Sequence, residues 1–113
     1  MEKEALITNF LQELRRGLLV LCVLANLKEP AYGYSLIEKL KNSDISIEAN
    51  TLYPLLRRLE GQMLLTSMWD TNGVKPRKYY VLTDFGNEIL YELKFNWQKT
   101  TQSINEILLE VKE

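Results

Sequence analysis

The chain has 113 residues, of which 46% are hydrophobic and 26% are charged, and its formal net charge is −1. This composition is typical of one soluble globular domain with a modest core, and it argues against a disordered or fibrous protein. The longest uninterrupted apolar segment spans residues 18–25, much shorter than the roughly 20 residues that a membrane-spanning helix requires. The first residues do not resemble a secretion signal, so we expect a cytoplasmic protein without a membrane partner.

The sequence lacks the usual motifs of catalysis. It contains no histidine and a single cysteine, Cys22, which lies inside the apolar segment and is expected to be buried. Serine-nucleophile arrangements, paired carboxylates, phosphate-binding glycine loops and Cys/His metal sites are also missing. Enzymatic function is therefore disfavoured, although a carboxylate or tyrosine site stays open, and we expect neither a metal nor another cofactor.

Two helices are expected in the N-terminal part of the chain. Across residues 4–27 the apolar positions recur at alternating steps of four and three, the spacing of one helical stripe. The stripe consists of Ile7, Leu11, Leu14, Leu18, Leu21 and Ala25. Pro30 should then end the first helix. A shorter helix is predicted over about residues 32–41. Its inward side is formed by Leu36, Ile37 and Leu40.

The segment of residues 50–65 indicates a third helix, because a projection at about 100° per residue makes one side apolar. That side carries Leu52, Leu55, Leu56, Leu59 and Met63. The opposite side carries Asn50, Pro54 and Arg57, flanked by Tyr53 and Arg58. Proline lacks a backbone donor and is tolerated best in the first turn. The helix should therefore begin between residues 48 and 51, with Asn50 and Thr51 as candidate caps.

A two-stranded β-hairpin is predicted over residues 64–81. Two runs with alternating side chains flank Asn72-Gly73, a pair that favours tight hairpin turns because both residues tolerate positive φ. The connection is either such a turn or a longer loop. Pro76 should shorten the second strand or mark its start.

A long final helix is predicted from Thr83, its N-cap, to about Val111. Its stripe again follows steps of four and three. This stripe consists of Gly86, Leu90, Leu93, Trp97, Thr100, Ile104, Ile107 and Val111. The helix would extend roughly 40 Å, whereas a domain of this length has a radius of gyration near 13 Å. We therefore expect it to project beyond its own core and to pack against an identical chain.

The order helix, helix, helix, hairpin, helix is that of a winged helix-turn-helix, whose third helix enters the DNA major groove while the hairpin touches the adjacent backbone. Residues 50–82 contain five basic and two acidic residues, a net charge of +3, although the whole chain carries −1. This local basic patch agrees with DNA binding. The predicted fold is mainly α with a small β-hairpin. Residues 1–82 form the winged helix-turn-helix, including the N-terminal helix, and residues 83–113 form a dimerisation helix in one compact unit.

Three segments, AYGYSLIEKL, NTLYPLLRRLEGQMLL and KPRKYYVLTDFGNEIL, resemble successive signatures of the PadR-like family of bacterial transcriptional regulators. The similarity extends over about residues 17–97, and the combination is specific although each segment alone is weak. With one C-terminal helix, the chain is similar to the short subfamily. The resemblance implies a homodimer that binds an inverted-repeat operator of double-stranded DNA and represses a nearby gene until a small planar molecule releases it. Glu48 departs from the pattern, because many relatives carry a serine cap there, and an acid near DNA phosphates would lower affinity.

Candidate DNA contacts come from three elements. On the third helix they are Asn50, Thr51, Tyr53, Pro54, Arg57 and Arg58, most of which offer groups that bond base edges or phosphates. On the second helix they are Tyr34 and Ser35, expected at backbone phosphate, and on the hairpin they are Lys75, Arg77 and Lys78. Because successive strand residues alternate sides, Lys75 and Arg77 are favoured over Lys78. Helix caps, solvated side chains, an ion pair of Arg58, core packing of Tyr34 and lysine protection of a strand edge are the competing interpretations.

The final helix supplies the expected dimer interface. Its residues are Leu93, Trp97, Thr100, Ile104, Ile107, Leu108 and Val111. In multidrug-sensing relatives a tryptophan eleven residues after the matching glycine stacks on flat aromatic ligands, and Gly86 and Trp97 have this spacing here. The resemblance therefore implies an effector site at Trp97, Leu93, Leu90, Ile7, Leu11 and Leu14. Plain packing between subunits is an equal alternative for Trp97.

Two functions of different classes compete. The first is a ligand-responsive dimeric repressor, and the second is a protein-interaction module that uses the winged-helix shape without reading DNA. Their dependence on salt separates them, because DNA binding weakens steeply as salt rises.

Overall fold

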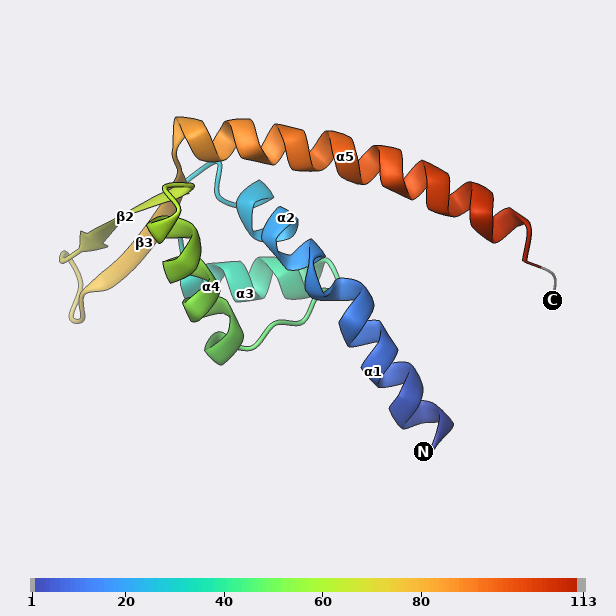
Figure 1. Ribbon diagram of the computed structural model, residues 1–113. Coiled ribbons are helices and arrows are strands. Elements are labelled where there is room, and N and C mark those ends of the chain that lie inside the picture. The colour runs from blue at the N-terminus through green and yellow to red at the C-terminus, as the bar shows by residue number, and fades with distance from the viewer. Residues whose placement is uncertain (1, 112–113) are drawn as a thin grey trace.

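A computed structural model describes residues 2–111, which form five helices and three strands (Figure 1). In chain order these are α1 (Lys3–Arg16), α2 (Leu18–Ala25), β1 (Ala31–Tyr32), α3 (Gly33–Asn42), α4 (Ala49–Gly61), β2 (Leu65–Asp70), β3 (Arg77–Leu82) and α5 (Asp84–Leu109). The predicted fold class, mainly helical with a small antiparallel sheet and a long C-terminal helix, is confirmed. Within residues 2–111 no helix is both long and apolar enough to cross a membrane.

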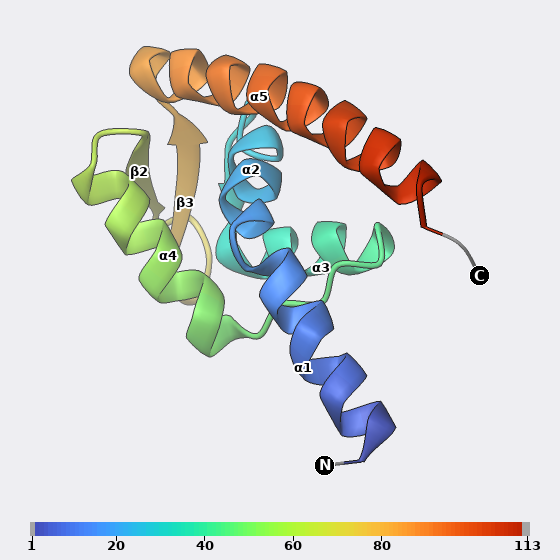
Figure 2. The same cartoon turned by 45° about the vertical axis from the view of Figure 1, so that its right-hand side comes forward.

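The N-terminal helix is interrupted at Gly17, so the prediction of one helix over residues 4–27 is wrong at this point. Gly17 keeps helical angles, with φ −72° and ψ −20°, but glycine is a weak helix former. Helix α1 has no buried residue and extends away from the body of the molecule (Figure 2). In α2 the buried side chains are Val23 and Leu24, whereas Ala25 of the predicted stripe is exposed.

The core lies where α2, α3 and α4 meet the first turns of α5. Its best-buried side chains are Val23 and seven leucines, each at most 1% exposed: Leu24, Leu27, Leu36, Leu40, Leu52, Leu56 and Leu59. Full burial of one such side chain stabilises the fold by about 1.5–3 kcal/mol. The inward positions predicted for α3 are confirmed, since Leu36 and Leu40 are buried and Ile37 is partly buried. Cys22 was expected to be buried but is only partly so, and this burial raises the pKa of its thiol.

Helix α4 begins within the predicted interval, but its N-cap is Glu48, which makes no side-chain capping bond. Asn50 and Thr51 lie inside the first turn, so their assignment as candidate caps is wrong. Pro54 lies one turn in and offers no N–H to the carbonyl of Asn50. Met63 also departs from the prediction. The helix ends at Gly61, Met63 has φ 67°, and its side chain is 73% exposed rather than packed.

The sheet has three antiparallel strands in the order β1-β3-β2. The predicted hairpin is confirmed, with Leu65 opposite Leu82 and Asp70 opposite Arg77. Its connection is the longer loop, residues 71–76, and neither Asn72 nor Gly73 adopts the expected positive φ. The Asn72 N–H instead donates to Asp70 Oδ1 at 3.0 Å. The two-residue strand β1 was not predicted, and we call β2, β3 and their loop the wing.

Helix α5 has the predicted cap, because the Thr83 hydroxyl accepts a hydrogen bond from the Gly86 N–H at 2.9 Å. The first half of α5 crosses above α2, and the second half leaves the body (Figure 2). The radius of gyration is 16.8 Å and the extents are 58 × 34 × 23 Å, well beyond the roughly 13 Å radius of a compact domain of this length. The projection of α5 beyond the core is therefore confirmed.

Candidate nucleic-acid interface

One side of α4 is anchored in the core and the other is free. Leu52, Leu56 and Leu59 are buried, and this fixes the rotation of the helix about its axis. The predicted DNA-facing positions of this helix are consequently all exposed: Asn50, Thr51, Tyr53, Pro54, Arg57 and Arg58. An exposed helical side that carries amide, hydroxyl and guanidinium groups can reach base edges in a major groove.

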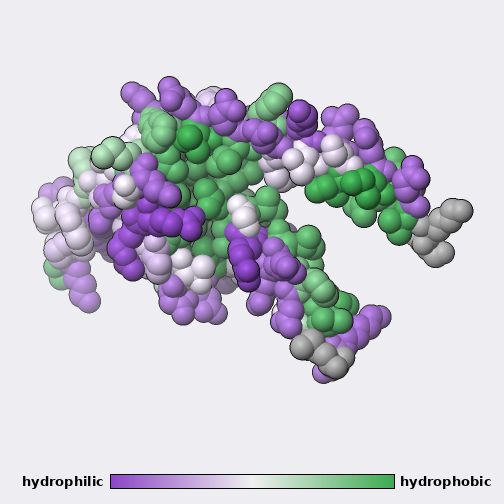
Figure 3. Space-filling view, viewed as in Figure 1, coloured by the Kyte–Doolittle hydropathy of each residue, from purple (hydrophilic) through white to green (hydrophobic). Residues whose placement is uncertain are grey.

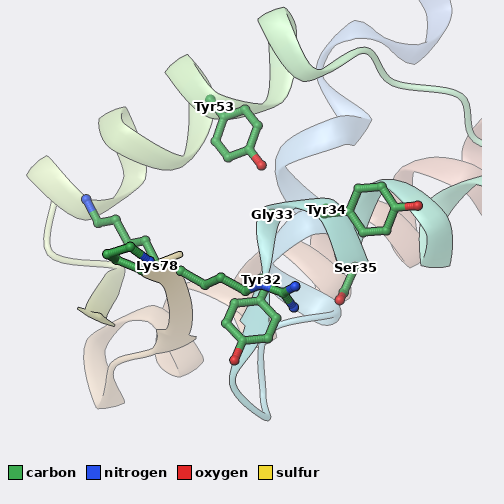
Figure 4. Close-up of a pocket in the computed structure, with 8 residues that line it drawn as sticks. Tyr32, Gly33, Tyr34, Ser35, Tyr53 and Lys78 are labelled. Atoms are coloured by element: carbon green, nitrogen blue, oxygen red, sulfur yellow. The ribbon is translucent and has the colours of Figure 1, made fainter. Parts of the chain in front are cut away.

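The start of α3 lies against α4 through a glycine. Gly33 is buried, and a Cβ atom added there would sit 2.6 Å from Cε1 of the Tyr53 ring. Only glycine lets Tyr53 approach the backbone so closely. Figure 4 shows the Tyr53 hydroxyl directed toward the start of α3. Tyr34 is 70% exposed beside it, which argues against core packing, and Ser35 is half-buried.

A cavity of about 540 Å³ lies between the start of α3, Tyr53 of α4 and residues 76–78 of the wing. Five of the predicted DNA contacts from three separate elements line it: Tyr34, Ser35, Tyr53, Arg77 and Lys78. The chain thus brings together hydroxyl groups, a helix N-terminus and two cations that are distant in sequence. Backbone N–H groups at a helix N-terminus together with cations suit phosphate oxygens.

Lys78 differs from the other wing cations because it forms an ion pair within the chain. Its Nζ lies 3.5 Å from Glu60 Oε1, 5.3 Å from the centroid of the Tyr80 ring and 6.0 Å from that of Trp69. The Ser67 hydroxyl donates to the other carboxylate oxygen of Glu60. Lys75 and Arg77 are exposed and are free of ion pairs within residues 2–111. The geometry agrees with the sequence-based preference for Lys75 and Arg77.

A small polar network where the wing loop begins was not predicted from the sequence. The Tyr32 hydroxyl donates to Asp70 Oδ2 at 2.7 Å, and the Arg77 guanidinium lies 5.6 Å from the centroid of the Tyr32 ring. The hydrogen bond to Asp70 is the main cause that raises the pKa of Tyr32. The same bond, then the Asn72 N–H, lowers the pKa of Asp70. The partners are 38 positions apart, so no local pattern indicates their contact.

Two exposed apolar surfaces lie away from this interface. Figure 3 shows hydrophobic side chains on the facing sides of the two projecting arms, α1 and the end of α5. On α1 they include Ile7, Leu11 and Leu14, which are 46%, 41% and 71% exposed. On α5 the predicted interface residues Trp97, Thr100, Ile104, Ile107 and Leu108 are exposed, and Leu93 is partly buried. Val111, which follows the end of the helix, is also exposed. Leu90 is only 4% exposed and belongs to the core.

Comparison with known proteins gives consistent matches. The model of the transcriptional regulator PadR-like family matches residues 20–92. A PadR family transcriptional regulator from Eggerthella lenta is 50% identical, with a TM-score of 0.89 over 96% of each chain. A PadR-like transcriptional regulator from Bacillus cereus is 31% identical, with a TM-score of 0.76 over 88% of this chain and 99% of the other. Bacillus subtilis PadR, solved with operator DNA, is 28% identical, with a TM-score of 0.61 over 66% of this chain and 45% of its own.

Proposed function

This chain belongs to the PadR-like family of transcriptional regulators, and from that premise we propose that it is a homodimeric repressor that binds an inverted-repeat operator. Members of the family are transcriptional regulators rather than enzymes. The observation that carries the proposal is the free side of α4, which is polar and basic while its other side is fixed in the core. The Bacillus subtilis relative that was solved with operator DNA supports the same reading.

On this proposal α4 enters the major groove. Asn50, Thr51 and Tyr53 in its first two turns approach base edges and phosphates, and Arg57 follows one turn later. Arg58 lies at the flank, where it reaches backbone phosphate. Pro54 lies on the exposed side of α4 and has no backbone N–H, so it shapes this surface without donating a hydrogen bond.

Two further elements would hold the duplex backbone. Tyr34 and Ser35 at the start of α3 would face phosphate together with Arg77, which lines the same cavity. Lys75 on the wing loop would add a further phosphate contact. Lys78 contributes less, since part of its charge is already balanced by Glu60. The acidic Glu48 at the start of α4 opposes phosphate binding and moderates the affinity.

The dimer proposal rests on the apolar arms. Helix α5 has 26 residues, and its second half extends beyond the core. In a monomer the apolar side chains of that half would be exposed to water. A second copy of the chain covers the same stripe on both subunits through a two-fold axis. That axis also places two copies of α4 in register with the two halves of an inverted repeat. The domain division after residue 82 belongs to this proposal, with α5 as the dimerisation helix.

An effector site between the subunits is the last part of the proposal. Trp97 is 43% exposed near the middle of α5, and Ile7, Leu11 and Leu14 on α1 offer further apolar surface. A flat aromatic molecule stacks well on an indole ring. Leu93 borders this surface, whereas Leu90 would support it from within the core.

The substitution Arg57→Ala tests the reading side of α4. Arg57 is exposed and absent from the core, so its removal should leave the fold and the dimer intact. The loss of one base contact corresponds to about 1–3 kcal/mol, a decrease in affinity of roughly five- to 150-fold. The measurement is fluorescence anisotropy with duplexes selected from random DNA. Lys99→Ala, which removes a similar exposed charge from α5, is the matched control and should bind normally. Equal affinities for all three proteins would refute the proposed contact, whereas no binding to any duplex by the unmodified protein would favour a protein-interaction module.

A further inference from the structure

The hydrogen bond between Tyr32 and Asp70 joins two parts of the molecule with different tasks. Tyr32 is the last residue of β1 and the N-cap of α3, so its backbone leads directly into the helix-turn-helix. Asp70 is the last residue of β2, where the wing loop begins. The 2.7 Å contact therefore fixes the start of the wing loop relative to the start of α3.

Both ends of the wing loop meet at Tyr32. At one end Asp70 uses Oδ2 for the Tyr32 hydroxyl and Oδ1 for the Asn72 N–H at 3.0 Å. At the other end Arg77 pairs with Asp70 across the sheet, and its guanidinium lies 5.6 Å from the Tyr32 ring centroid. Tyr79 supports the ring from the side, with centroids 5.8 Å apart and planes at 85°. The phenol thus contacts one loop end through its hydroxyl and the other through its ring.

Arg77 is the cation that this arrangement restrains. It is exposed and lines the cavity between the wing and the helices, together with Tyr34, Ser35 and Tyr53. A free arginine side chain has many rotamers, and ordering it on DNA costs entropy. A ring held beneath the guanidinium lowers that cost before DNA arrives. The Asp70 carboxylate would repel nearby phosphates, but the Tyr32 hydroxyl and the Arg77 charge compensate it.

We propose that Tyr32 and Asp70 are positioning residues that hold Arg77 and the wing toward the DNA backbone. Neither residue belongs to the buried core, and the two are joined by a hydrogen bond between polar side-chain groups. They therefore act through Arg77 rather than through the hydrophobic packing of the domain. The inference rests on the proposed function, because it assigns them a part in DNA binding.

A double-mutant cycle tests the inference. Tyr32→Phe deletes the hydroxyl while keeping the ring under Arg77, and Tyr79→Phe is the matched control because the Tyr79 hydroxyl has no hydrogen-bond partner within residues 2–111. We expect Tyr32→Phe to weaken duplex binding roughly three- to tenfold and to reduce its salt dependence. Tyr79→Phe should bind as the unmodified protein does. In an Arg77→Ala background, Tyr32→Phe should have almost no further effect. Thermal melting verifies that each variant is folded.

Three outcomes would contradict these statements, and they are distinguishable. Normal duplex binding by Tyr32→Phe would refute the inference alone. An equal loss with and without Arg77 would also refute it, because the hydroxyl would then act on the domain in general. Failure of the unmodified protein to bind any selected duplex would refute the proposed function, and the inference with it.

Discussion

Gly86 fixes the angle at which α5 leaves the wing, and its substitution by alanine should be strongly destabilising. The added Cβ would lie 2.0 Å from the Leu64 carbonyl oxygen and 2.9 Å from the Leu64 carbonyl carbon. An ordinary carbon–oxygen contact is about 3.3–3.6 Å, so backbone would have to move by more than about 1 Å. That same oxygen accepts the Thr83 N–H at 3.1 Å, so a shift of α5 also strains its cap.

The expected magnitude follows from these contacts. Overpacking costs about 1–3 kcal/mol, and each weakened hydrogen bond adds about 0.5–1.5 kcal/mol. The higher helix propensity of alanine relative to glycine offsets about 1 kcal/mol of this cost. With two hydrogen bonds weakened, the free energy of unfolding should therefore fall by about 1–5 kcal/mol, which lowers Tm by roughly 5 °C or more in a chain of this size.

Urea unfolding followed by circular dichroism measures this change. Gly61→Ala is the matched control, because no atom lies within 4 Å of the added Cβ. Gly61 is the last residue of α4, so both glycines lie in a terminal turn of a helix. It should leave stability unchanged or raise it by up to about 1 kcal/mol. If Gly86→Ala were as stable as Gly61→Ala, the close contact between α5 and Leu64 would not exist in solution.

Two predictions concern the apolar arms. Ile107→Glu should convert the dimer to a folded monomer in sedimentation experiments, because a charge would enter the α5 interface, whereas Phe95→Glu should stay dimeric. Phe95 is a fair control, since the two side chains are 64% and 65% exposed but Phe95 lies away from the stripe. Trp97→Ala should abolish the quenching of tryptophan fluorescence by flat aromatic compounds, while Trp69→Phe should retain it. Quenching that survives in Trp97→Ala would place the ligand elsewhere.

Local patterns in the sequence predicted most helices because periodicity reflects burial. The stripes of α3 and α4 emerged correctly, since Leu36, Leu40, Leu52 and Leu56 all face one core. The Thr83 cap could also be predicted from the sequence, because the N–H group whose hydrogen bond it accepts lies only three residues away. Met63 continued the α4 stripe in sequence but left it in space, because the helix stopped at Gly61. Hydrophobic spacing alone does not encode where a helix ends.

Features that depend on distant partners were not predictable. Strand β1 is two residues long and exists because β3 pairs with it. The prediction of a tight turn at Asn72-Gly73 was wrong, because the Asn72 N–H donates to the Asp70 carboxylate instead. The connection is also a six-residue loop, which does not require positive φ at these positions. The contact of Tyr53 with Gly33 and the bond of Tyr32 to Asp70 also join separate segments. The chemistry of the proposed DNA contacts was visible in sequence, but the cavity that five of them line was not.

The salt dependence of duplex binding by the unmodified protein tests the central claim most directly. Each neutralised phosphate contributes about −0.9 to the slope of log K against log salt. Each subunit exposes three cations that the proposal assigns to phosphate: Arg58, Lys75 and Arg77. A dimer that engages all of them should give a slope of about −5, together with a saturation of two chains per inverted repeat. A slope near zero, or no association with any duplex at low salt, would contradict the account.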